Sequence, residues 1–186
     1  RLGQEFHAYA SLLKRDKERI KRAKKSIQTV NMGASAIGTG INVDLQYFVD
    51  IVPAINHETG LELTQAQDLI DATNNLDSLV EVSSALKNLA VNLSKISNDL
   101  RLMSSGPKTM VGDLELPPRQ NGSSIMPGKV NPVIPEVMSQ VAFRVIGNDL
   151  TVSMCSEAGQ MELNAFEPVL FFSLYESIEI LTHGMH

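Results

Sequence analysis

The chain has 186 residues, a formal net charge of −5 at pH 7 and 43% hydrophobic residues, which is enough to bury a substantial core. The acidic balance argues against a general nucleic-acid binder, and no apolar run has the length of a membrane span or the pattern of a signal peptide. Cys155 is the single cysteine. An intrachain disulfide is therefore excluded, and we expect a reducing, cytoplasmic setting in which this thiol is a small buried hydrophobe.

The first predicted element is a helix from Phe6 to Val30. Its apolar residues recur at steps of three, four or seven, which predicts one buried face: Tyr9, Leu13, Ile20, Ala23, Ile27 and Val30. Eight basic residues and only two acids lie between Lys14 and Lys25. A nucleic-acid stripe is one interpretation, but the absence of interleaved aromatic residues favours a solvated face. Three glycines then end the pattern without the spacing of a phosphate-binding loop: Gly33, Gly38 and Gly40.

A longer helix is predicted from Thr64 to Ser104. Thr64 and Gln67 have the spacing of a capping box. Apolar residues then alternate steps of three and four, a 3.5-residue period typical of left-handed bundle packing: Leu79, Val82, Leu86, Leu89, Leu93, Ile96, Leu100 and Met103. Gly106 and Pro107 are expected to end this helix.

Two more helices are predicted after a long loop at residues 107–131. One runs from Val133 to about Ala158, and the other from Glu162 to Leu181 with a kink near Pro168. No alternating strands stand out. Long helices with short joints predict an all-α fold, an elongated bundle of long helices over residues 1–186.

The long loop contains the most informative segment, Gly122-Ser-Ser-Ile-Met-Pro-Gly-Lys-Val-Asn131. Glycine and proline favour a loop that leads into the N-terminus of the next helix. The segment combines hydroxyls, a fixed positive charge and backbone N–H donors, which suits a carboxylate substrate. By composition alone, an ordinary surface loop is an equal alternative.

This segment resembles the signature loop of the aspartase/fumarase superfamily, G-S-S-x-M-P-x-K-x-N. Further segments resemble the superfamily in the same order along the chain: residues 2–6, 36–40, 98–101, 105–107 and 146–149. The resemblance covers nearly the whole chain and implies the superfamily's central helical domain. It also implies a homotetramer whose sites are shared between subunits, a small dicarboxylate substrate, no organic cofactor, and no nucleic-acid or membrane partner.

The resemblance assigns roles to five residues. Ser123 is the base that removes the β-proton, Ser124 lies beside the substrate, and Lys129 and Asn131 hold its carboxylate. Because negative charge accumulates on carboxylate oxygens during such an elimination, a fixed cation and N–H donors lower the barrier. Glu136, one turn into the next helix, is the supporting residue, since its equivalent in relatives can orient an active-site histidine.

Each of these residues also has a purely structural alternative. Ser124 and Asn131 could make turn hydrogen bonds, and Lys129 could be a solvated loop lysine. His183 and His186 lie three residues apart and could share a metal, but surface histidines are commoner. We therefore predict no metal site.

Segments after the loop resemble the aspartate ammonia-lyases more than the fumarases: residues 131–137, 156–164 and 167–169. A fumarate hydratase or another lyase of the superfamily is the first alternative, and a helical assembly module without activity is the second. Relatives carry a Thr-His motif before the segment that matches Leu2–Phe6, and this chain begins at Arg1. We therefore expect a fragment cut at both ends that is inactive by itself.

Overall fold

The computed structural model describes residues 1–106, 108, 110–126 and 128–186. The predicted helix end at Pro107 and the signature proline, Pro127, lie outside the described residues. The chain divides into two compact units. The first contains residues 1–16, 86–147 and 176–186, and the second contains residues 17–85 and 148–175.

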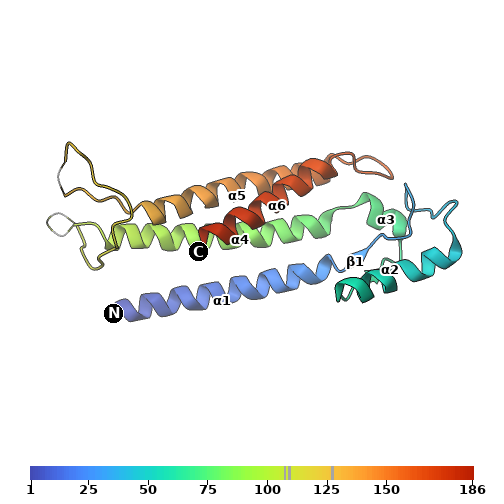
Figure 1. The fold of residues 1–186 in the computed structure, drawn as a ribbon, viewed down its shortest axis with the longest axis horizontal. Coiled ribbons are helices and arrows are strands. Elements are labelled where there is room, and N and C mark those ends of the chain that lie inside the picture. Colours follow the sequence, from blue (N-terminus) through green and yellow to red (C-terminus); the bar gives the residue numbers. More distant parts are fainter. Residues whose placement is uncertain (107, 109, 127) are drawn as a thin grey trace. The chain divides into compact units, whose positions relative to one another are not determined.

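The described residues form six helices and two very short strands (Figure 1), which confirms the predicted all-α class. In chain order these are α1 Leu2–Ser26, β1 Thr29–Val30, α2 Leu45–Thr59, β2 Thr64–Gln65, α3 Leu69–Asn74, α4 Asp77–Met103, α5 Val133–Glu157 and α6 Glu167–Gly184. Among these helices, none is both long enough and apolar enough to cross a bilayer.

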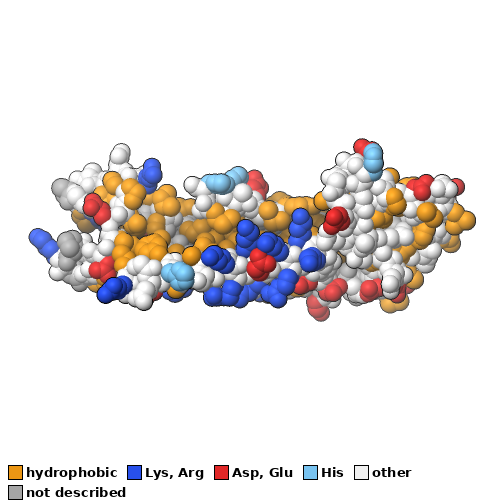
Figure 2. All heavy atoms as spheres, turned by 90° about the horizontal axis from the view of Figure 1, so that it is seen from below, with side chains coloured by type: hydrophobic (Ala, Val, Ile, Leu, Met, Phe, Trp, Pro, Cys, Tyr) orange, Lys and Arg blue, Asp and Glu red, His pale blue; other side chains and the backbone are white. Residues whose placement is uncertain are grey.

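Helix α1 confirms the first predicted helix and most of its apolar face, but Ile27 lies beyond the end of α1 and is 37% exposed. Tyr9 and Ala23 are buried, with 8% and 2% of their surface exposed. Most of the basic residues between Lys14 and Lys25 are exposed instead, and Figure 2 shows basic side chains gathered on one face. Lysines near the end of α1 also interact favourably with the helix dipole.

The predicted continuation of this helix to Val30 is wrong. Val30 lies in β1, which pairs in parallel with β2. The N–H of Thr64 donates to the carbonyl of Gln28, and the N–H of Ala66 donates to that of Val30, both at 2.9 Å. Backbone pairing with a distant segment therefore replaces the last helical turn.

Helix α2 was not predicted from the sequence. The Asp44 carboxylate caps its start by accepting two backbone N–H bonds of the first turn, at 2.8 and 3.1 Å. Gly60 ends the helix in the left-handed conformation, with a φ of 68°. Asp44 and Gly60 are the sequence features that could have predicted this helix. Pro53 argues against a helix when only the sequence is considered, because proline is unfavourable inside helices.

The predicted helix start at Thr64 is also wrong, because Thr64 belongs to β2. Asp68 provides the cap instead, since its carboxylate accepts two backbone N–H bonds of α3 at 3.0 Å. Asn75 then adopts an extended conformation, with φ −89° and ψ 133°, and separates α3 from α4. The predicted single helix is therefore two helices.

The 3.5-residue stripe on α4 is confirmed as its packing face. Every residue of the stripe is buried or half-buried, and Leu86 and Leu89 are 8% and 9% exposed. Small residues between the stripe positions are buried as well: Ser83, Ala85, Ala90, Ser94 and Ser97. Small side chains let neighbouring helices approach closely along this face.

Helix α5 confirms the next predicted helix, and Val145 and Val152 on it are almost fully buried. Helix α6 begins at Glu167, five residues later than predicted. The predicted kink at Pro168 is wrong, because Pro168 is the second residue of α6. The first N–H groups of a helix have no intrahelical acceptor, so a proline at this position removes no helix hydrogen bond.

Each unit has its own core. In the first unit the buried hydrophobic residues are Tyr9, Leu86, Leu89, Ala90, Met138, Ala142, Val145 and Leu181. In the second they are Ala23, Ala34, Val52, Leu76, Ala85, Val152, Cys155, Leu170 and Leu174. The expectation that Cys155 is a small buried hydrophobe is confirmed.

A polar cluster joins α1 to α4 inside the first unit. The Tyr9 hydroxyl donates to Oδ2 of Asp99 at 2.7 Å, and the Lys95 ammonium donates to the same oxygen. Burial, together with the hydrogen bond to Asp99, raises the pKa of Tyr9 to about 12. Burial alone would raise the pKa of Asp99, but the hydrogen bonds from Lys95 and Tyr9 outweigh it and lower this pKa.

We expect Tyr9 to make the fold less stable at alkaline pH. Its folded-state pKa of about 12 exceeds the usual 10.0. Between these values the unfolded chain loses the proton first, so the free energy of unfolding falls, by up to about 3 kcal/mol. Denaturant titrations of Tyr9→Phe should lack this decline, whereas Tyr47→Phe, at an exposed tyrosine, should keep it. An equal decline in the wild type and in Tyr9→Phe would contradict the explanation.

Candidate active site

The connection from α4 to α5, residues 104–132, begins by folding back on the end of α4. The N–H groups of Asp113 and Leu114 both donate to the carbonyl of Met103, at 2.8 and 3.1 Å. The N–H of Gly112 donates to the carbonyl of Ser105 at 2.6 Å. These bonds satisfy carbonyls that the helix end leaves without intrahelical donors, and they attach the first part of the loop to α4.

Ser123 lies half-buried in the second part of the loop. Its Oγ accepts the backbone N–H groups of Ile125 and Met126, both at 3.2 Å. Hydrogen bonds that a group accepts in its charged form favour that form. Two N–H donors directed at one hydroxyl oxygen therefore favour negative charge on it, which is the condition that a serine base needs.

A tight turn brings Gly122 close to Lys129. A Cβ added at Gly122 would lie only 2.6 Å from the Lys129 carbonyl oxygen. Within the turn, the N–H of Lys129 donates to the carbonyl of Met126 at 3.1 Å, and Gly128 has a φ of 80°. Both glycines are required here, Gly122 for the close approach of two backbone segments and Gly128 for the left-handed conformation.

The other predicted site residues are exposed around this turn. Ser124, Lys129 and Asn131 are all on the surface. Among the described residues, the Lys129 ammonium has no carboxylate partner within ion-pair distance. Its charge is thus available to an anionic ligand.

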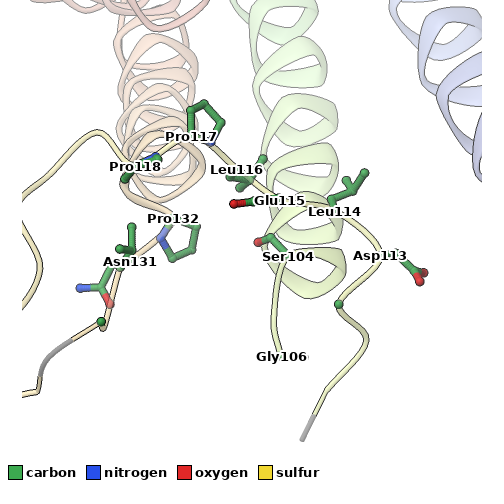
Figure 3. A pocket seen from close by; sticks show the side chains of 13 residues that line it. Ser104, Gly106, Asp113, Leu114, Glu115, Leu116, Pro117, Pro118, Asn131 and Pro132 are labelled. Atoms are coloured by element: carbon green, nitrogen blue, oxygen red, sulfur yellow. The ribbon is translucent and has the colours of Figure 1, made fainter. Parts of the chain in front are cut away.

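A hollow of about 660 Å³ opens between the two parts of the loop (Figure 3). Asn131 lines it together with Ser104 at the end of α4. The structure therefore places Asn131 at the hollow but leaves Ser123, Ser124 and Lys129 outside its lining. Of the predicted site residues, Asn131 is the one that lines this hollow in the described part of the chain.

Two acidic residues, Asp113 and Glu115, belong to the lining of the hollow, and sequence analysis gave them no role. Carboxylates repel a dicarboxylate unless cations offset them. No Lys or Arg side chain is part of this lining among the described residues. The hollow by itself is therefore a poor dicarboxylate site.

Glu136 lies in the first turn of α5, as predicted, where the helix dipole favours a negative charge. Its Oε1 is 3.8 Å from Nη2 of Arg101, which lies near the end of α4. The contact of Arg101 with Glu136 was not predicted from the sequence. The segment 98–101 resembled the superfamily, but its arginine and Glu136 are too distant in sequence for their contact to be predicted.

The histidines give no support to a metal site. Within the part of the chain that the structure describes, no group of three or more His, Cys, Asp or Glu side chains could hold a metal ion. His183 and His186 are exposed near the end of the chain. His57 is exposed as well and lies 3.2 Å from Glu58, its neighbour in sequence.

Comparisons with known proteins agree on one family. A family model described as Lyase matches residues 1–147. The chain is 57% identical over 182 residues to an aspartate ammonia-lyase from Bacillus sp, covering 98% of this chain. It is 54% identical over 184 residues to the aspartate ammonia-lyase of Bacillus subtilis (strain 168), covering 99% of this chain. In both cases the match spans 39% of the relative's length.

Solved structures have the same fold over the same extent. A fumarate lyase:delta crystallin from Brucella melitensis bound to cobalt matches with a TM-score of 0.95 and 46% identity, over 99% of this chain and 40% of that chain. A recombinant class II fumarase from Schistosoma mansoni matches with a TM-score of 0.88 and 31% identity, over 98% and 41%. The helical architecture is therefore shared by proteins with two different names.

We expect Gly122→Ala to open the turn that carries Ser123. The new Cβ would contact the Lys129 carbonyl at 2.6 Å, so one of the two backbone segments must move. Amide hydrogen exchange of residues 120–126 should become faster. Gly147→Ala is the matched control, because a Cβ there meets nothing within 4 Å. Unchanged exchange in Gly122→Ala would mean that the close approach does not hold the turn.

Proposed function

Because this chain belongs to the lyase family, within the aspartase/fumarase superfamily, we propose that the protein containing it is an aspartate ammonia-lyase. The proposed reaction is the reversible conversion of L-aspartate to fumarate and ammonia. The observation that carries the proposal is the pair of N–H bonds to Ser123 Oγ, in a chain more than half identical to enzymes of that name.

Ser123 is the proposed base. Its oxygen takes a proton from the carbon next to the substrate's β-carboxylate, and the electron pair left behind spreads onto the carboxylate oxygens. A serine is a strong base only when ionised. The N–H groups of Ile125 and Met126 stabilise that ionised form, and the positive charge of Lys129, six residues further along the same turn, does so at longer range.

Lys129 and Asn131 are the proposed binders of the substrate's carboxylate. As negative charge builds up there, the ammonium of Lys129 and the amide N–H of Asn131 bind it more tightly. The N-terminus of α5, which begins at Val133, adds a favourable dipole. The electron pair then forms the C=C bond as ammonia leaves, and Ser124 contacts the substrate from the adjacent position.

We further propose a homotetramer in which each site is completed by other subunits. In the described part of the chain, the lining of the hollow beside Asn131 includes Asp113 and Glu115 but no Lys or Arg, so the additional cations and donors that a dicarboxylate needs must come from other segments. Large apolar side chains on α5 are also uncovered, and Phe143 is 65% exposed. Exposed apolar faces of this kind are typical of subunit interfaces. A cytoplasmic location is proposed from the single, buried Cys155.

A fumarate hydratase is the second candidate. The specific observation in its favour is the fold shared with a class II fumarase at a TM-score of 0.88. Both reactions pass through the same kind of carbanion, so the loop around Ser123 suits either. Selectivity depends on groups that contact the departing amine or hydroxyl.

Replacement of Ser123 by alanine in the full-length protein should lower kcat by about a thousandfold, because it removes the base. Ser124→Ala should raise KM and lower kcat much less. Ser123 also caps two N–H groups, so thermal unfolding must be measured to separate loss of the base from loss of the fold. Near-normal turnover by folded Ser123→Ala would show that another group is the base.

Substrate preference should separate the two candidates. The full-length protein should form fumarate from L-aspartate, and its rate with L-malate should be lower by about a hundredfold or more, because polar groups that bind the departing amine are left poorly paired by a hydroxyl. Fumarate absorbance, measured in parallel assays with each substrate, gives both rates. A preference for malate would assign the protein to the hydratases and would leave the proposed role of Ser123 in place.

A further inference from the structure

An ion pair joins the two helices on either side of the α4–α5 connection that contains the signature loop. Arg101 lies in the last turn of α4, and Glu136 lies in the first turn of α5. Nη2 of Arg101 is 3.8 Å from Oε1 of Glu136, and the two side chains are 42% and 36% exposed. The same guanidinium donates from Nη1 to Oδ1 of Asn98 at 3.4 Å, which orients it along α4.

An exposed ion pair of this length contributes little to the stability of a whole fold. The pair can still affect the loop, because it connects the last turn of α4 to the first turn of α5. The backbone bonds from Asp113 and Leu114 to Met103 attach only the first part of the loop to α4. The second part, with Ser123 and Asn131, leads into α5, so its position relative to α4 follows the first turn of α5.

We propose that Arg101 is a positioning residue for the reaction. By binding Glu136, it holds the first turn of α5 against the last turn of α4 and so fixes the place of Asn131 beside the hollow. Arg101 acts through Glu136 and does not contact the substrate. The inference rests on the proposed function in one respect, namely that the loop from Ser123 to Asn131 performs the chemistry.

The same unit contains a matched ion pair remote from the loop. Nε and Nη2 of Arg144, on α5, both lie 2.8 Å from Oε2 of Glu176, on α6. The exposed fractions of these side chains are 58% and 27%. This pair is shorter than the pair of Arg101 with Glu136. If Arg101 affected activity only through the stability of the fold, replacing Arg144 should therefore lower activity at least as much as replacing Arg101.

The first test compares Arg101→Met with Arg144→Met in the full-length protein. Arg101→Met should lower kcat by about tenfold or more, with a smaller change in KM, because the loop donors act mainly in the transition state. Arg144→Met should change kcat less than about twofold. Arg101→Lys keeps the charge and should recover part of the loss. Equal effects of the two methionine variants, or an unchanged kcat in Arg101→Met, would overturn the proposal.

The second test needs no activity. Hydrogen exchange measured by mass spectrometry should become faster at residues 120–126 and 128–131 and in the first turn of α5 in Arg101→Met, and should remain unchanged there in Arg144→Met. Unchanged exchange in Arg101→Met would overturn the positioning role even if activity fell. Faster exchange in a protein that acts on neither aspartate nor malate would refute the proposed function and support the anchoring by Arg101.

Discussion

The connection between α4 and α5 has to hold polar groups in fixed positions without help from regular secondary structure. Its backbone N–H and carbonyl groups need partners, and each partner also determines where the loop lies. The Met103 carbonyl accepts two N–H groups and holds one part of the loop to α4. Ser123 Oγ accepts two more, so the bonds that satisfy the backbone also prepare this oxygen to carry negative charge.

Buried carboxylates make the helix packing specific in both units. In the first unit Asp16 is fully buried and accepts both hydrogen bonds of the Asn92 amide, at 3.0 and 2.8 Å. In the second unit Asp149 is 5% exposed and accepts the Ser83 hydroxyl at 2.9 Å. A shift of one helix along its neighbour would separate a buried carboxylate from its donor, which is costly. These contacts favour one register among the many that apolar stripes allow.

The charges around the loop are of both signs. Lys129 provides a cation and α5 a favourable dipole, but Asp113 and Glu115 line the adjacent hollow with the opposite sign. A bound dicarboxylate would be attracted by the charge of Lys129 at one end and repelled by the acidic residues at the other. Completion of the site by other subunits, as proposed above, is the arrangement that would reverse this balance. The distance between α4 and α5 at the loop also affects the proposed site, because it sets where Asn131 lies relative to the end of α4.

The sequence by itself determined the all-α class, the approximate extents of α1 and α5 and the end of α4, because apolar periodicity reports which face of a helix is buried. It also identified the loop from Gly122 to Asn131, whose residue types are informative wherever they lie. Only the tertiary structure decided the rest. Val30 pairs with a distant strand instead of continuing α1, and α3 is separate from α4 because Asn75 adopts an extended conformation. The N–H bonds to Ser123 and the contact of Arg101 with Glu136 depend on the path by which the chain returns, and no local pattern encodes that path.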